Sequence, residues 1–176
     1  MSGFLRKLQH DDLSLIRQWR NHPEINKFMF SQHEITQQEH QAWFESSQQN
    51  ALRHLFVFEE QDELKGFLQL QQKSADSNVF EWGFYICPDA VRGTGSRMAK
   101  LAIDLAFLEL NAIKLYGEAL GFNQPSIRLH QKLGFVEEGL LRKQHFLNNQ
   151  YHDVHCFGML KAEWQPSAQQ SKVGKS

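Results

Sequence analysis

The segment 91–96, Val-Arg-Gly-Thr-Gly-Ser, follows a strand-like stretch and opens a helical one. The first N–H groups of a helix lack acceptors and its dipole favours negative charge, so a glycine-rich helix start is suited to bind anions. Gly93 and Gly95 let the main chain approach a pyrophosphate, while Arg92 and Arg97 can add charge-assisted hydrogen bonds. Taken alone, the pattern is only weak evidence for a phosphate site, because the same turn also serves simply to start a helix. Neither a P-loop nor a dinucleotide fingerprint is present.

Several elements are needed to position this turn. Residues 4–9 are typical of a strand, and Asp11 is a candidate N-cap for a helix to about Trp19. Thr36 and Glu39 form a capping box for a second helix, ending near Gln49. The β-rich segments 52–59, 64–72 and 79–87, with turns at 60–63 and 74–78, then predict a meander of strands.

The second half of the chain returns to helical spacing. The apolar residues Met98, Leu101, Ala102, Leu105, Ala106 and Leu108 predict a central helix with one face on a sheet. Residues 113–119 predict a strand, 125–133 a helix with proline in its first turn, and two further strands should flank the turn at Asn148-Asn149. We expect one domain over residues 1–165 and a disordered tail over 166–176.

Composition argues against several classes of partner. The 176 residues carry a net charge of −1 with the cations scattered, which disfavours a nucleic-acid or membrane surface and favours small-molecule substrates. Cys87 and Cys156 lack metal-type spacing and predict no disulfide, as in a reducing cytoplasm. His152 and His155 should point to opposite faces of a strand, so no metal is expected.

A second segment strengthens the functional interpretation of the glycine turn. Residues 123–135 have the sequence Asn-Gln-Pro-Ser-Ile-Arg-Leu-His-Gln-Lys-Leu-Gly-Phe and, together with 91–96, resemble the acetyl-coenzyme A segments of the GCN5-related N-acetyltransferase (GNAT) family. The resemblance covers roughly residues 4–163. It implies an α/β (α+β) fold, with a single mixed, mostly antiparallel sheet of about seven strands flanked by helices and splayed between strands 79–87 and 113–119. Acetyl-CoA would lie in that opening as if it were another strand.

The resemblance also implies the cofactor-binding residues. A main-chain group of Tyr85 or Ile86 would polarise the thioester, and the glycine turn and the second segment would hold the rest of the cofactor. The implied set is Tyr85, Ile86, Arg92, Gly93, Thr94, Gly95, Ser96, Arg97, Asn123, Ser126 and Lys132. Arg97 departs from the family pattern, which usually has Gly or Ala there.

Acetyl transfer needs a neutral amine, a polarised carbonyl and a proton for the leaving sulfur. His130 stands where many GNAT members carry a tyrosine that protonates the thiolate, and imidazole is in principle as suitable; alternatively it is only a polar surface position. Glu118 resembles the base of related N-terminal acetyltransferases, and Glu81 is its competitor. Either glutamate could instead hold an ammonium or an arginine, with water relaying the proton.

The N-terminal part suggests the acceptor. Residues 19–25, 28–30 and 35–43 resemble the PseH-type acetyltransferases of pseudaminic acid biosynthesis, which acetylate the 4-amino group of a UDP-linked 4-amino-4,6-dideoxy sugar. A nucleotide sugar needs cations and aromatic faces, for which Arg20, Met29, Phe30, His40 and Trp43 are candidates, although these aromatics could simply be core. Two alternatives stay open: an acetyltransferase acting on the N-terminus of a ribosomal protein, and a CoA-binding module without catalysis. A homodimer is also left open.

Overall fold

The computed structural model describes residues 3–166, and their core is one seven-stranded sheet in the order β1-β2-β3-β4-β5-β7-β6. The strands are β1 (Phe4–Lys7), β2 (Arg53–Glu60), β3 (Glu63–Ser74), β4 (Ser77–Ile86), β5 (Lys114–Leu120), β6 (Val136–Leu147) and β7 (Gln150–Leu160). Every neighbouring pair is antiparallel except β4 and β5, which run parallel. The predicted mixed sheet and β2–β4 meander are confirmed.

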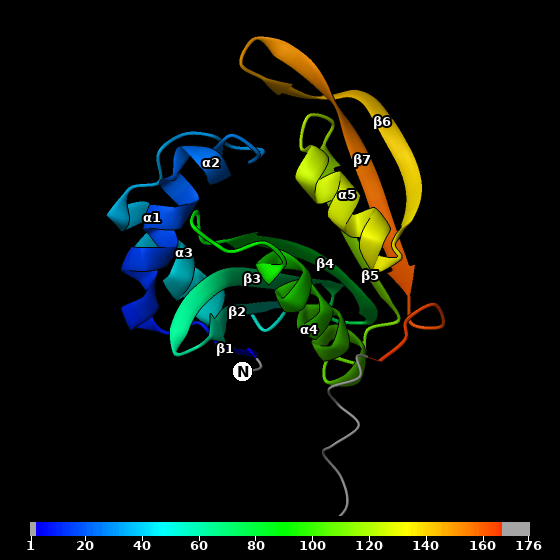
Figure 1. The fold of residues 1–176 in the computed structure, drawn as a ribbon, viewed down its shortest axis with the longest axis horizontal. Helices are drawn as coiled ribbons and strands as arrows, with labels where there is room; N and C mark the ends of the chain where they lie inside the picture. Colours follow the sequence, from blue (N-terminus) through cyan, green and yellow to red (C-terminus); the bar gives the residue numbers. More distant parts are fainter. Residues whose placement is uncertain (1–2, 167–176) are drawn as a thin grey trace, which may run out of the picture.

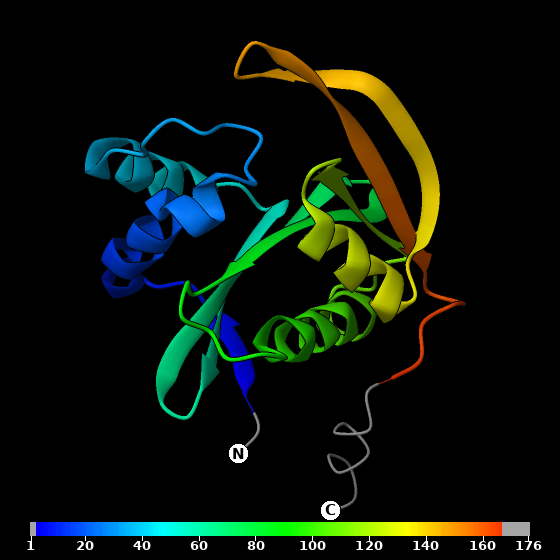
Figure 2. The ribbon, with the colours of Figure 1, turned by 45° about the horizontal axis from the view of Figure 1, so that its top comes forward.

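Helices cover both faces of the sheet (Figures 1 and 2). On one face lie α1 (Leu13–Asn21), α2 (Pro23–Asn26) and α3 (Gln37–Gln48); α4 (Thr94–Leu108) and α5 (Gln124–Leu133) lie on the other. The alternation of strand side chains explains this, since Leu55 and Val57 of β2 pack under the N-terminal helices while Phe56 packs under α4. The central strands are therefore buried on both faces.

Capping and turn residues in the sequence predicted most helix and strand ends correctly. The Thr36–Glu39 capping box is present, with reciprocal hydrogen bonds of 3.2 and 2.7 Å. Two of the three two-residue hairpins in the described chain turn at residues with positive φ, namely Gln61-Asp62 and Asn148-Asn149, as a type I′ turn requires. Residues 167–176 of the expected tail lie outside the described part of the chain.

The predicted start of the first helix is wrong. Asp11 lies in a 3-10 turn (His10–Asp12) and its side chain is fully exposed, whereas α1 starts at Leu13. Asp12 is the buried carboxylate, and it accepts hydrogen bonds from Arg6 at 2.8 and 2.9 Å instead of capping the helix. The short helix α2, with Pro23 in its first turn, was not predicted.

No helix within residues 3–166 is long and apolar enough to cross a membrane.

Candidate active site

The site is built where β4 and β5 part. The two strands pair at only three positions, of which the last is Glu81 with Tyr116, and β4 then continues to Ile86 while β5 continues to Leu120. Their other edges stay paired with β3 and β7. In the described structure, the edge of residues 82–86 that faces β5 therefore has no strand partner. Such free main-chain groups can bind an extended ligand like an added strand, and the predicted splay is confirmed.

A cavity of about 240 Å³ fills this opening. We call it the channel; it is lined on the β4 side by Phe84, Tyr85 and Ile86, and on the helix side by Gly95, Asn123, Pro125, Ser126 and Leu129. Residues of the segment 24–29 close its far side. The channel brings together residues from both of the motifs that stand out in the sequence.

The glycine turn has the geometry of an anion site. Gly93 is the N-cap of α4 with φ of 96°, a left-handed conformation that favours glycine. The amides of Gly95 and Ser96 start the helix, so they have no intrahelical acceptors. Arg92 is exposed beside the turn. Backbone donors and the exposed Arg92 guanidinium are thus available to a pyrophosphate.

Two predicted cofactor residues have other partners. Arg97 donates two hydrogen bonds of 2.7 Å to Glu60 and one of 3.1 Å to the Thr94 hydroxyl. Thr94 in turn donates to the carbonyl of Val91 at 2.8 Å and is buried. The structure therefore does not support cofactor contacts by the Arg97 or Thr94 side chains; instead they fix the turn to the β2–β3 hairpin.

The second motif caps α5. Asn123 is the N-cap residue, and its Oδ1 accepts a hydrogen bond from the Ser126 amide at 3.2 Å. This cap orients the first turn of α5 toward the channel, where the Ser126 side chain contributes to the wall. The helix ends at Gly134, which has φ of 90°.

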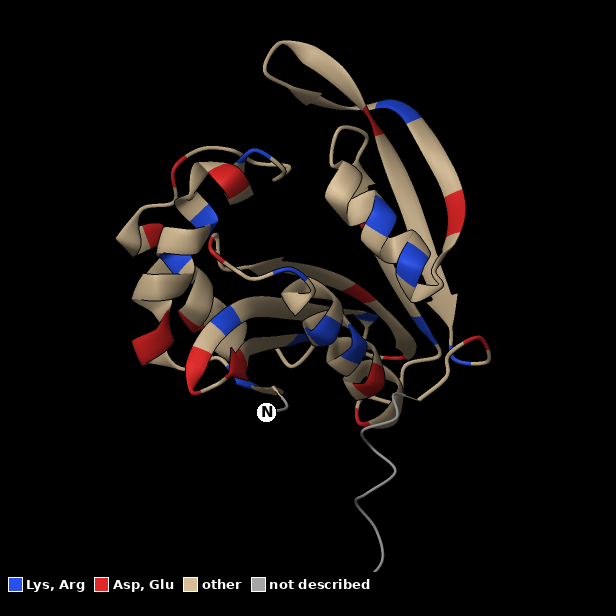
Figure 3. Ribbon diagram, in the orientation of Figure 1, with Lys and Arg blue, Asp and Glu red and all other residues tan. Residues whose placement is uncertain are grey.

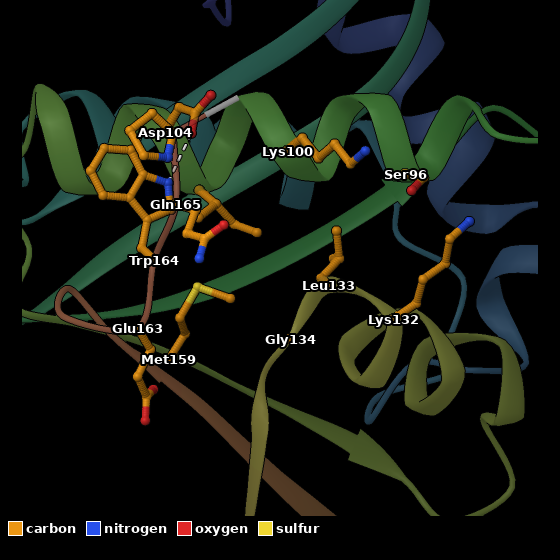
Figure 4. Close-up of a pocket in the computed structure, with 12 residues that line it drawn as sticks. Ser96, Lys100, Asp104, Lys132, Leu133, Gly134, Met159, Glu163, Trp164 and Gln165 are labelled. Carbon is orange, nitrogen blue, oxygen red and sulfur yellow. Dashed lines mark hydrogen bonds between the residues drawn. The ribbon is translucent and has the colours of Figure 1, made fainter. Parts of the chain in front are cut away.

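An outer cavity of about 440 Å³ lies between α4, α5 and the segment 163–166. Figure 4 shows the Lys100 and Lys132 side chains extending toward Ser96 at one end, and Trp164 at the other. Both lysines are exposed at its rim. The cavity combines cations with an aromatic wall, a combination suited to a phosphorylated nucleoside.

A third cavity, of about 490 Å³, opens on the opposite face of the sheet, between β3, β4 and the N-terminal helices. We call it the acceptor pocket. It is lined by Arg20, Met29, His33, Ile35, Glu39, His40, Trp43, Phe67, Gln69, Gly83, Phe84 and Tyr85. Phe84 and Tyr85 line the channel as well, so the two cavities meet at the end of β4.

Of the five predicted acceptor residues, four line this pocket. His40 stacks on Trp43 with ring centroids 5.0 Å apart, and burial followed by the charges of Arg17 and Arg20 lowers the His40 pKa. A neutral imidazole beside an indole forms an aromatic wall.

Phe30 is the exception. It is absent from the pocket lining and packs against His145 at the tip of the β6–β7 hairpin, with ring centroids 5.0 Å apart. The His145 Nε2 also lies 2.8 Å from the Phe30 carbonyl oxygen, and Asn148 donates to Gln32 at 3.2 Å. Phe30 therefore joins the loop 27–35 to the hairpin instead of contacting an acceptor in this pocket.

Arg20 is the cation of the acceptor pocket. Its guanidinium donates to Asn26 Oδ1 at 2.9 Å and to the Ser31 carbonyl at 2.6 Å, which ties down the loop above the pocket. Within residues 3–166, no carboxylate forms a salt bridge with it. Burial lowers the Arg20 pKa, but an arginine stays charged at neutral pH. The pocket thus contains a guanidinium that forms no salt bridge with the described residues, together with the carboxylate of Glu39.

His130 is buried in the core, and only 2% of its surface is exposed. Its Nε2 accepts a 3.0 Å hydrogen bond from Trp82 Nε1, and its Nδ1 lies 2.8 Å from the Ser126 carbonyl, to which it donates. Burial lowers the His130 pKa. Gly117 of β5 packs directly against this pair, because a Cβ added at position 117 would lie only 2.5 Å from Trp82 Nε1. Because neither nitrogen faces the channel, the geometry does not support the predicted acid role.

The two candidate bases differ in their environment. Glu81 lies on the same face of β4 as Gly83 and Tyr85, and its Oε2 accepts a 3.4 Å hydrogen bond from Tyr116. Burial, followed by the charge of Glu118, raises the Glu81 pKa. Glu118 is exposed on β5. Glu81 does not line the acceptor pocket but lies two residues from Gly83, which does, and its raised pKa makes it the better candidate for a general base.

Neither cysteine is poised as an acyl carrier. Cys87 is buried, and burial, followed by the nearby Asp89, raises its pKa to about 11. Burial likewise raises the pKa of Cys156. Because the thiolate is the nucleophile, the raised pKa makes each thiol a poor candidate for an acyl carrier.

Comparison with known proteins identifies the family. The model of the acetyltransferase (GNAT) domain matches residues 4–136. This chain is a GNAT acetyltransferase. It is accordingly an N-acetyltransferase of the kind that uses acetyl-CoA, as its motifs predicted.

Relatives with several names share this fold. Spermidine N-acetyltransferase from Vibrio cholerae, solved with CoA and spermine, has a TM-score of 0.85 at 27% identity over 92% of this chain and 97% of that one. Spermidine N(1)-acetyltransferase of Escherichia coli K12 is 29% identical over 85% of this chain and 81% of its own. Acetyltransferase PseH of Campylobacter jejuni is 28% identical over 74% and 80%.

Several lining residues were missed by the sequence analysis. Phe67, Gln69 and Gly83 form the floor of the acceptor pocket, and Lys100 lies at the rim of the outer cavity. The strand residues carried no distinguishing signal, because they look like ordinary alternating sheet positions. Lys100 could have been predicted, because it lies one helical turn after Ser96 and therefore on the same face of the helix.

Gly83 offers a way to block the acceptor pocket without disturbing the fold. A Cβ there would meet nothing within 4 Å, and valine suits a strand. We expect Gly83→Val to raise the KM for the acceptor about tenfold or more while leaving the dissociation constant of CoA unchanged, because the side chain fills only the pocket. Steady-state kinetics and calorimetry with CoA would measure both.

Gly139→Val is the matched control, since this β6 position also has open space around it and lies outside the pocket. Unchanged acceptor kinetics in Gly83→Val, with the protein folded, would show that the acceptor binds elsewhere.

Proposed function

We propose that this enzyme acetylates the 4-amino group of a UDP-linked 4-amino-4,6-dideoxy sugar, by direct attack on acetyl-CoA in a ternary complex. The observation that carries the proposal is the Arg20 guanidinium, which lies in the acceptor pocket without a carboxylate partner in the described chain. An arginine with free donors suits the diphosphate of a nucleotide sugar. The stacked His40 and Trp43 supply a flat surface for a base or sugar ring.

A polyamine is the competing acceptor, because two of the relatives named above are spermidine acetyltransferases. A polycation requires carboxylates in its pocket. Here Glu39 is the one carboxylate among the described lining residues, and it already accepts a hydrogen bond from the Thr36 amide at 2.7 Å and pairs with His33 at 3.2 Å. The Arg20 guanidinium, which has no salt bridge within residues 3–166, and the engaged Glu39 carboxylate therefore support an anionic acceptor over spermidine.

In the proposed complex, the acyl donor spans two cavities. Pantetheine would occupy the channel beside residues 84–86, the pyrophosphate would accept from the amides of Gly95 and Ser96, and the adenosine part would lie in the outer cavity near Lys132. The amine would enter from the acceptor pocket, with Glu81 taking its proton directly or through water. A main-chain N–H of Tyr85 or Ile86 would polarise the carbonyl.

The charge of Arg20 gives a test of the acceptor. We expect wild-type enzyme to release thiol from acetyl-CoA with the UDP-4-amino sugar, and Arg20→Gln to raise the KM for that sugar about tenfold, the value of one charge-assisted contact. The KM for spermidine, if it reacts at all, should fall. Initial rates with the nucleotide sugar, spermidine and short peptides as acceptors would measure this.

Asn26→Ala is the control for loop structure, because it removes one Arg20 hydrogen bond but keeps the cation. Turnover confined to spermidine or to peptides, with Arg20→Gln neutral, would contradict the nucleotide-sugar assignment and leave the family intact.

The pH dependence tests Glu81 as the base. A base must be deprotonated, so kcat/KM should rise with pH through the raised Glu81 pKa. Glu118→Gln removes a neighbouring negative charge and should move this acidic limb of the pH–rate profile to lower pH. Tyr116→Phe removes a hydrogen bond that stabilises the carboxylate and should move it to higher pH.

Opposite displacements in these two variants, together with loss of the limb in Glu81→Gln, are the expected pattern in pH–rate profiles. An acidic limb that neither variant moves would assign it to another group.

A further inference from the structure

We propose that the Ser126 hydroxyl is the hydrogen-bond donor to the CoA sulfur that departs during acetyl transfer. The inference rests on acetyl transfer from acetyl-CoA, which family membership establishes, and is independent of the acceptor. It assigns to Ser126 a role in the reaction, beyond forming the wall of the channel.

The need for such a donor follows from the burial of His130. Both imidazole nitrogens are satisfied inside the core, by Trp82 Nε1 at 3.0 Å and by the Ser126 carbonyl at 2.8 Å. The ring also stacks on Phe157, with centroids 4.8 Å apart. Turning it toward the channel would break both hydrogen bonds and this stacking, and would leave the Trp82 N–H unpaired in the core.

Ser126 lies one helical turn before position 130, where the tip of a long, channel-facing side chain at 130 would reach. A side chain on a helix leans toward the N-terminus and covers the turn before it, so a group at position 130 extends over position 126. Because the His130 ring is turned into the core instead, this part of the channel wall belongs to Ser126.

The Ser126 hydroxyl is free to point into the channel. Its Oγ lies 3.4 Å from His130 Nδ1, which donates mainly to the Ser126 carbonyl, so the imidazole N–H faces the oxygen and leaves the hydroxyl proton for a ligand. The other hydroxyl of the channel lining, that of Tyr85, lies 3.5 Å from the Ile16 carbonyl under the N-terminal helices. Burial raises the Tyr85 pKa, which makes it a weaker acid.

The reaction balances without an acidic side chain. The amine nitrogen attacks the thioester carbon, the N–C bond forms, and the C–S bond breaks with its electron pair remaining on sulfur. The amine proton passes to Glu81 or water. Since a thiol has a pKa of about 8.5, the thiolate is a fair leaving group, and a hydrogen bond from Ser126 stabilises it until solvent supplies the proton.

The first test needs no acceptor. A hydrogen bond to the thiolate lowers the thiol pKa of bound CoA, so Ser126→Ala should raise that pKa by about 1 unit, and Ser126→Thr should restore it. Thiolate absorbance of the saturated protein–CoA complex, titrated with pH, would measure it. His130→Phe keeps a ring stacked on Phe157, at the cost of the Trp82 hydrogen bond, and should leave this pKa unchanged. A rise in that folded variant and none in Ser126→Ala would overturn the proposal.

Kinetics supply the second readout. With whichever amine the wild type acetylates, Ser126→Ala should lower kcat about tenfold while the dissociation constant of acetyl-CoA stays the same. Wild-type kcat in Ser126→Ala would contradict the donor role. Absence of turnover with the nucleotide sugar alone would count against the proposed acceptor and leave the thiol titration as the test of Ser126.

Discussion

The parting of β4 from β5 after the Glu81–Tyr116 pair is the constraint on which the site depends. It is held open by α5, whose His130 is locked to Trp82 and stacked against Phe157 of β7. Sheet edges are ordinarily covered because unpaired backbone groups are costly. Here the uncovered edge faces a channel, and a candidate cofactor site, a candidate base and the end of the acceptor pocket all lie around one short stretch of β4.

Some lysine and arginine side chains form salt bridges with carboxylates, whereas others lie unpaired at the cavities of the described structure. Figure 3 shows that the Lys and Arg segments are spread over the molecule, including α4 and α5, and are interspersed with acidic ones. Arg6 and Arg97 are each held by carboxylates, whereas Lys100 and Lys132 lie at the outer cavity and Arg20 lies in the acceptor pocket. The net charge of −1 conveys none of this. No salt bridge within residues 3–166 involves Arg20, Lys100 or Lys132, so these cations are open to a ligand.

Features governed by neighbours in sequence could be predicted. The glycine turn, the Thr36 capping box and the Asn148-Asn149 hairpin depend on local backbone chemistry, and all are found. Residues whose roles depend on distant partners could not. Arg97 is satisfied by Glu60, 37 residues away, and His130 by Trp82, 48 residues away, and neither partner is signalled by spacing. Phe30 likewise contacts His145 at the β6–β7 hairpin tip, 115 residues further along the chain.

Hydrogen exchange would test the central claim most directly. If the free edge of β4 receives the cofactor, addition of CoA should slow amide exchange about tenfold or more in residues 82–86, and also in the first turns of α4 and α5. Exchange in the β6–β7 hairpin should change little. Protection confined to the outer cavity or the hairpin, with the amides of 82–86 exchanging as in the free protein, would contradict the account.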